Sequence, residues 1–189
     1  MNEIEKLVEL LKQRRQVLIE KTVQIKKIND EVELKELYKK AGEYDEKKYC
    51  FGDSNPVKYA INKEEGQEDF AIIYEGNVIG FVSIWYFSKV IKHQKCIAIA
   101  LDKEYRGNSI AKYALNETIK YCFENDINIK AIIVTINIKN QDSKNLIKNT
   151  DFRRIPTQKI FMIRNNHFER LNMYGITRKR YERSKNDGK

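Results

Sequence analysis

The segment from Tyr105 to Ala111, YRGNSIA, constrains the fold more than any other part of the sequence. It follows an apolar run, Cys96 to Leu101, and precedes a helical pattern that continues from Lys112 to about Asn125. In a short glycine-containing loop between a strand and a helix, the backbone N–H groups point outward, and the helix N-terminus adds partial positive charge. The pattern therefore predicts a strand, a loop that binds an anion, and a helix.

A second unit of the same kind follows along the chain. A strand-like run from Ala131 to Ile136 leads to Asn140 and Ser143, which head a short helix that ends before Asp151-Phe152. Asn and Ser at the start of a helix are common capping residues. Contact with a ligand is the alternative use of these two side chains, and one residue can serve both uses.

Composition bounds the class of protein. The length of 189 residues suits one domain, and 41% apolar residues with two prolines exclude a disordered or fibrous protein. No apolar stretch approaches the roughly 18 residues of a membrane span, and the N-terminus lacks a secretory signal. Three cysteines and two histidines without paired spacing argue against a disulfide framework and a metal site, so we expect a cytoplasmic protein.

The formal net charge of +9 favours an anionic partner, which is nucleic acid, a ribosome or a phosphate-bearing cofactor. Alternatively, lysine is common because the coding sequence is AT-rich, and the lysines are simply solvated surface residues. This explains the charge equally well. The basic segment after Thr177 is expected to be a frayed end that makes at most a weak electrostatic contact.

Apolar periodicity predicts further helices and strands around the two units. They are a helix from Glu3 to Glu20, a strand from Thr22 to Ile28, a helix capped by Asn29 or Asp30, a turn from Phe51 to Pro56, a hairpin of Phe70–Tyr74 and Val78–Phe87, and closing strands Ile160–Arg164 and Leu171–Thr177. Hairpins mixed with strand–helix crossovers indicate an α/β protein with a mixed sheet. The apolar stripe of the first helix packs on its own domain or forms a dimer contact, so a monomer and a homodimer both remain open.

This order of elements and these motifs resemble the GNAT N-acetyltransferase superfamily from about Thr22 to Tyr181. Features shared with its ribosomal-protein N-terminal (alanine) acetyltransferase-like branch are Ile79-Gly80 in the hairpin, Asn140 and Ser143 before Phe152, and the segment from Tyr174 to Arg178. The resemblance implies a single-domain fold with a mixed, mostly antiparallel sheet flanked by helices, and an extra N-terminal helix. It implies a helical extension at residues 1–20, an acetyltransferase domain at 21–183 and a basic tail at 184–189.

The resemblance also implies acetyl-CoA as the acyl-donor cosubstrate. In the family, the loop holds the CoA pyrophosphate and the preceding strand pairs with the pantetheine arm. The implied cofactor-binding residues are Ile99, Ala100, Leu101, Arg106, Gly107, Asn108, Ser109, Ile110, Ala111, Asn140 and Ser143. The implied catalytic groups are the Leu101 amide, which stabilises the oxyanion, and Ser143, which protonates the leaving thiolate. Ser109 departs from the family pattern, which has a glycine there that lets the backbone approach the phosphates.

Both common catalytic side chains of the family are replaced. Cys96 stands where many members have a Glu general base, and Ile147 stands where many have a Tyr general acid. Without a strong base, the site suits an α-amine, whose reference pKa near 8 leaves part of it neutral, better than a lysine side chain near 10.4. Glu68, Asp69, His93 or a water chain are the alternative bases.

The sequence therefore predicts an acetyl-CoA-dependent N-acetyltransferase that modifies a primary amine by direct attack. The favoured acceptor is a protein or peptide N-terminal α-amine. A polyamine, an antibiotic or an aminoacyl-tRNA is the alternative acceptor, and the charge of +9 fits the last. The alternative of another class is a non-catalytic acyl-CoA-binding module. Neither a membrane contact nor a metal is expected.

Overall fold

The computed structural model describes residues 3–44, 64–156, 160–164 and 167–187. In chain order the elements are α1 (Glu3–Thr22), β1 (Val23–Ile28), α2 (Glu31–Tyr44), β2 (Glu68–Tyr74), β3 (Asn77–Tyr86), β4 (Gln94–Leu101), the short helix η1 (Lys103–Tyr105), α4 (Ile110–Asn125), β5 (Ala131–Asn137), α5 (Gln141–Lys148), β6 (Arg153–Arg154), β7 (Ile160–Arg164), β8 (His167–Thr177) and α6 (Arg178–Asp187). The predicted turn from Phe51 to Pro56 lies outside the described residues.

Within the described residues, eight strands form one sheet in the order β1-β2-β3-β4-β5-β8-β6, and β7 pairs with β8 beside this path. Every neighbouring pair is antiparallel except β4 and β5, which are parallel. The parallel pair requires a crossover connection, which α4 provides. The predicted α/β fold with a mixed, mostly antiparallel sheet is therefore confirmed.

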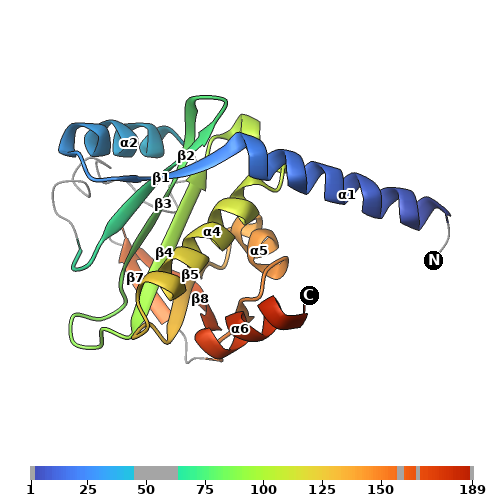
Figure 1. Cartoon of the computed structure of the whole chain (residues 1–189). Helices are drawn as coiled ribbons and strands as arrows, with labels where there is room; N and C mark the ends of the chain where they lie inside the picture. The colour runs from blue at the N-terminus through green and yellow to red at the C-terminus, as the bar shows by residue number, and fades with distance from the viewer. Residues whose placement is uncertain (1–2, 45–63, 157–159, 165–166, 188–189) are drawn as a thin grey trace.

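The sheet separates two apolar layers, with α2 on one face and α4 and α5 on the other (Figure 1). Successive side chains of a strand point to opposite faces. Phe81 of β3 therefore packs in the smaller layer with Leu34 of α2, while Val82 packs in the larger layer with Leu115 of α4. This alternation decides which side chains of β2, β3 and β4 reach each layer.

Helix α1 projects away from the body of the molecule (Figure 1). Ile19 near its C-terminal end is buried, but Ile4, Leu7 and Leu11 are 73%, 57% and 56% exposed. Packing of the apolar stripe on its own domain is therefore wrong for most of the helix. The physical reason is that α1 passes at Thr22 directly into β1, without a loop that would fold the helix back. Among the described helices, none combines the length and apolar character needed to cross a membrane.

The segment after Thr177 forms helix α6, so the predicted frayed end is wrong. The Arg178 guanidinium donates hydrogen bonds to the carbonyl oxygens of Ile129, Phe123 and Asp126 at 3.0, 2.8 and 2.7 Å. These carbonyls lie near the end of α4 and in the connection to β5. Charge-assisted hydrogen bonds of this kind are stronger than neutral ones, and they join the start of α6 to the body.

Gly80 sets the spacing between β3 and β4 where β4 ends. It pairs with Leu101 across the two strands. A Cβ atom at position 80 would lie 2.6 Å from the Ala100 carbonyl oxygen and 2.9 Å from Leu101 Cδ1. Because a backbone oxygen of a paired strand has little freedom to move aside, this close approach requires glycine.

We predict that Gly80→Ala lowers the free energy of unfolding by about 1–3 kcal/mol, because the added methyl group forces the two strands apart. Gly175→Ala is the matched control in the same sheet, since its Cβ would approach the mobile end of the Ile155 side chain, at 2.9 Å. Urea denaturation measures both variants. An equal loss of stability in the two would contradict the crowding between β3 and β4.

Candidate active site

Strands β4 and β5 pair over a short distance and then separate. Their parallel register covers Gln94↔Ala131, Lys95↔Ile132 and Cys96↔Ile133. Beyond Cys96, a cavity of about 420 Å³ opens between them, lined by Ile97 to Ile99 from β4 and by Val134 to Asn137 from β5. A volume of this size is typical of small-molecule sites.

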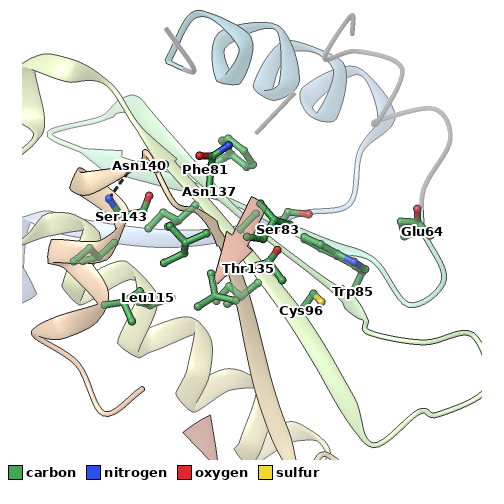
Figure 2. Close-up of a pocket in the computed structure, with 18 of the residues that line it drawn as sticks. Glu64, Phe81, Ser83, Trp85, Cys96, Leu115, Thr135, Asn137, Asn140 and Ser143 are labelled. Atoms are coloured by element: carbon green, nitrogen blue, oxygen red, sulfur yellow. Dashed lines mark hydrogen bonds between the residues drawn. The ribbon is translucent and has the colours of Figure 1, made fainter. Parts of the chain in front are cut away.

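The cavity joins the two faces of the sheet. Figure 2 shows Asn140 and Ser143 of α5 on one side of it, and Ser83 and Trp85 of β3 on the other. Tyr38 of α2 also lines the wall on the side of β3. A ligand in the cavity therefore contacts the layers of α2 and of α4 and α5 at the same time.

The free edge of β4 presents backbone hydrogen-bonding groups to the cavity. The Asp102 amide donates to the Ile79 carbonyl oxygen at 2.8 Å. This hydrogen bond shows which backbone groups of β4 face β3 and which face away from it. Because hydrogen-bonding directions alternate along an antiparallel strand, the amides of Leu101 and Ile99 point away from β3, and the Ala100 amide points toward it. Of these residues, Ile99 also lines the cavity. An extended ligand can pair with such an edge as an added strand does.

The loop from Gly107 to Ser109 is exposed and leads into α4. Gly107 and Ser109 both adopt left-handed backbone conformations, with φ of 75° and 62°. The first amides of a helix have no partner within it, and the Ser109 side chain makes no capping hydrogen bond to them. These amides suit an anion. Ser109, which replaces the family's glycine, thus holds a conformation that glycine adopts without steric cost.

Two arginines reach this loop from different elements. The Arg106 Nε donates to the Leu101 carbonyl oxygen at 2.9 Å, which holds the side chain against the end of β4. Arg15 of α1 donates to Asn108 Oδ1 at 2.6 Å and to the Gly107 carbonyl oxygen at 3.2 Å. Arg15 was not predicted as a site residue, because 92 residues separate it from Gly107 and no local pattern links them. Both guanidinium groups add positive charge beside the exposed amides.

Asn140 and Ser143 meet at the start of α5. The Asn140 Oδ1 accepts the Ser143 amide at 3.1 Å, so the capping interpretation is confirmed. Ser143 and Ile147 both line the cavity, because residues four apart share one face of a helix. Since Ile147 provides only apolar surface, Ser143 is the hydroxyl group that this face of α5 brings to the cavity.

Cys96 and His93 are poorly placed to accept a proton from a ligand. Burial raises the pKa of the Cys96 thiol to about 12, so the thiol stays neutral at pH 7. His93 is exposed and does not line the cavity. Among the described residues, no group of His, Cys, Asp or Glu is arranged to hold a metal ion.

Glu68 forms an ionic network on the α4 side of the sheet. Its carboxylate accepts hydrogen bonds from Lys27 Nζ at 2.5 Å, Lys95 Nζ at 2.6 Å and the Tyr121 hydroxyl at 2.7 Å. Partial burial opposes ionisation, but these hydrogen bonds outweigh it and lower the pKa of Glu68 to about 2. A carboxylate held in this way is a weak base, and Glu68 does not line the cavity.

Asp69 lies on the opposite side, toward α2, and is fully buried. Its carboxylate accepts hydrogen bonds from Tyr38, Gln67 and Ser83, and these three residues line the cavity. We call Tyr38, Gln67, Asp69 and Ser83 the α2-side polar cluster. Of these four residues, only Asp69 was among the bases predicted from the sequence. The alternation of side chains along β3 could have predicted the position of Ser83, because it places Ser83 on the same face of the sheet as Phe81.

A model of the acetyltransferase (GNAT) family matches residues 31–152, which is more than half of the chain. No curated protein matches the chain.

Several solved structures share the fold. An acetyltransferase (GNAT family) from Bacillus anthracis is 20% identical, with a TM-score of 0.64 over 82% of this chain and 95% of that chain. An N-acetyltransferase from Staphylococcus aureus Mu50 is 16% identical, with a TM-score of 0.66 over 82% and 98%. A spermidine N-acetyltransferase from Vibrio cholerae in complex with CoA and spermine is 15% identical, with a TM-score of 0.66 over 86% and 99%. At these identities the likeness is one of fold.

We predict that Glu68→Gln destabilises the protein by roughly 3 kcal/mol at pH 7, because the ionised carboxylate is lost and Lys95 is left buried without its partner. The folded-state pKa of about 2 lies below the ordinary value of 4.5, so ionised Glu68 stabilises the fold above pH 4.5. This contribution declines as the pH falls from 4.5 toward 2. The difference in the free energy of unfolding between wild type and Glu68→Gln should therefore narrow over that range.

Denaturant unfolding at a series of pH values measures this effect. Glu117→Gln is the control, because within the described part of the chain Glu117 forms only a 3.8 Å surface ion pair, with Lys120, and it should change stability by less than about 1 kcal/mol. If the difference in the free energy of unfolding between wild type and Glu68→Gln stayed constant down to pH 2, the ionic network would not be the cause of that difference.

Proposed function

The chain belongs to the acetyltransferase (GNAT) family and is an acetyl-CoA-dependent N-acetyltransferase, and from this premise we propose that its acceptor is a small cationic amine of the polyamine type. The observation that carries the proposal is the cavity between β4 and β5, in which Glu64 is the charged residue among the described residues that line it. Arg106 and Arg15 lie at the loop that follows β4. Glu64 lines the cavity itself, and Asp69 lies behind the lining residue Ser83, whose hydroxyl donates to it.

The end at the loop suits the acetyl donor. The pyrophosphate of CoA fits the exposed amides of residues 107–111 and the two guanidinium groups, which form charge-assisted hydrogen bonds with phosphate. The pantetheine arm fits the free edge of β4 at Ile99. In this pose the thioester enters the cavity between β4 and α5, where Asn140 and Ser143 line the wall.

The reaction follows from the groups around the thioester. The neutral amine attacks the carbonyl carbon, and the free-edge amides of β4, Ile99 in the cavity and Leu101 beside it, stabilise the oxyanion. The carbon–sulfur bond then breaks, and the Ser143 hydroxyl passes a proton to the leaving thiolate. These two roles are our assignment for Leu101 and Ser143.

The opposite end suits a cation. Trp85, which pairs with Cys96, and Glu64 line the cavity away from the loop, and the aromatic rings of Phe81 and Tyr38 line it on the side of α2. Carboxylates and aromatic faces are the groups that bind ammonium ions. The Vibrio cholerae spermidine N-acetyltransferase, whose structure contains CoA and spermine, has the same fold. Both observations support a polyamine-type acceptor over the protein N-terminal α-amine that the sequence analysis favoured.

A protein N-terminal α-amine is the second candidate acceptor. Position 96 of β4, where many members of the family have a Glu base, is a cysteine, and burial keeps its thiol neutral. An α-amine, with a reference pKa near 8, needs less help to lose its proton than a polyamine does. This acceptor would fit the predicted ribosomal-protein branch, and the charge of +9 fits a ribosome or tRNA contact. Binding to nucleic acid would weaken steeply as salt is added.

We predict that Ala111→Glu raises the dissociation constant of acetyl-CoA about tenfold or more, because it places a carboxylate beside the phosphates. Ala111 lies in the first turn of α4, while Asn116 lies further along on its exposed side. Asn116→Glu adds the same charge to the same helix and should leave the constant within about threefold of wild type. Isothermal titration measures the dissociation constant of acetyl-CoA for both variants. Equal constants for wild type and Ala111→Glu would show that the loop is not part of the donor site.

We further predict that release of free CoA thiol from acetyl-CoA is fastest with spermidine in a panel that also holds an aminoglycoside, an aminoacyl-tRNA and peptides with free N-termini. The reason is the Glu64 carboxylate and the aromatic side chains that line the cavity. Faster release with the peptides would establish the second candidate instead. Acetyl-CoA binding without thiol release for any amine would indicate a non-catalytic binding module.

A further inference from the structure

Asp69 is a buried carboxylate whose partners are all neutral. Its exposure is 0%. The Tyr38 hydroxyl and the Ser83 hydroxyl donate to Oδ1 at 2.8 and 2.7 Å, and Gln67 Nε2 lies 3.2 and 3.1 Å from the two carboxylate oxygens. Among the described residues, no cation contacts this carboxylate. A buried negative charge without a counter-charge is costly, so a cationic ligand beside the cluster would be stabilised.

The neighbouring Glu68 has the counter-charges that Asp69 lacks. Lys27 and Lys95 both form ion pairs with Glu68 on the α4 side. The side chains of consecutive strand residues point to opposite faces, so these lysines are separated from Asp69 by the sheet. Lys27 and Lys95 thus neutralise Glu68, which faces away from the cavity. Asp69, behind the cavity wall, accepts hydrogen bonds from neutral donors.

The Ser83 hydroxyl connects Asp69 to the acyl donor. Ser83 pairs with Ala98 of β4, and both residues line the cavity. Figure 2 shows Ser83 in the wall of the cavity between Phe81 and Trp85. A nitrogen atom that contacts the Ser83 hydroxyl from the cavity therefore lies beside the strand that pairs with the pantetheine arm.

Tyr38 and Gln67 complete the cluster as fixed donors. Gln67 Oε1 accepts the Glu64 amide at 2.8 Å, which directs Nε2 toward the Tyr38 hydroxyl, at 2.7 Å, and toward Asp69. Burial, and next the negative charge of Asp69, raise the pKa of Tyr38 well above its usual range. The phenol therefore keeps its proton, and among the described residues Ser83 is the donor that can pass a proton from the ligand to the carboxylate.

On the basis of the proposed function, we propose that the α2-side polar cluster is the acceptor subsite, which binds the primary ammonium group of a polyamine-type acceptor and removes its proton through Ser83 to Asp69. The ammonium group contacts the Ser83 oxygen, and the Asp69 carboxylate balances its positive charge. Ser83 acts on the ligand directly, whereas Asp69 acts through Ser83.

One N–H bond of the ammonium group breaks and its proton bonds to Ser83 Oγ, while the Ser83 proton moves to Asp69 Oδ1. The freed electron pair on nitrogen forms the bond to the thioester carbon. The sulfur leaves with the electron pair of the carbon–sulfur bond and gains a proton as a second proton leaves the nitrogen. The proton held on Asp69 then returns through Ser83 to solvent in the emptied cavity, so the products are the acetylated amine, CoA thiol and one proton.

The test compares wild type with Asp69→Asn and Ser83→Ala, using acetyl-CoA and spermidine from pH 6 to pH 10. Both variants should lose about 100-fold or more in kcat/KM near pH 7, the usual contribution of a general base. In the variants, kcat/KM should rise about tenfold per pH unit toward the pKa of the free amine near 10, because only the neutral amine reacts. In wild type, kcat/KM should be nearly flat over the same range.

Thr118→Val is the matched control, because it removes another buried hydroxyl, one that donates to the Ala114 carbonyl oxygen outside the cavity. It should keep the wild-type pH profile, and acetyl-CoA should bind all four proteins with similar affinity. Wild-type kcat/KM in Ser83→Ala, or a loss that is the same at every pH, would overturn the proposal while the proposed function stands. Wild type that binds acetyl-CoA but does not acetylate spermidine would overturn both the polyamine acceptor and this subsite.

Discussion

The separation of β4 from β5 is the constraint on which the site depends. Each strand has a full antiparallel partner on its other side, since seven pairs join β4 to β3 and seven join β5 to β8. The sheet therefore holds both strands in place even where their facing edges do not meet. Unpaired backbone groups inside a protein need a partner. An extended ligand with its own donors and acceptors is the partner that the cavity admits.

The charges around this cavity matter more than the net charge of the chain. The value of +9 alone does not distinguish a ribosome contact from a lysine-rich surface. The placement of individual groups does distinguish two regions: Arg15 and Arg106 lie at the loop, Glu64 lines the cavity, and Asp69 lies behind the cavity wall at Ser83. This division matches a donor that carries phosphates and an acceptor that carries ammonium, and it brings α1 into the site through Arg15.

Local patterns predicted the fold well, because the hairpin and the strand–loop–helix unit are each specified by neighbouring residues. The same holds for Asn140, whose capping bond spans three residues. The errors arise where distant segments meet. Arg178 bonds carbonyls 49 to 55 residues away, which no pattern in the basic tail reveals. Tyr38 and Gln67 likewise join Asp69 only after α2 packs on the sheet, so the sequence indicated a carboxylate without its partners.

A crystal structure of the protein with bound acetyl-CoA tests the central claim most directly. The account predicts that the thioester lies in the cavity between Ile99 and Ser143, with the pantetheine arm along the free edge of β4 and the pyrophosphate on the amides of residues 107–111. Acetyl-CoA bound elsewhere, with the space between β4 and β5 unused, would contradict it.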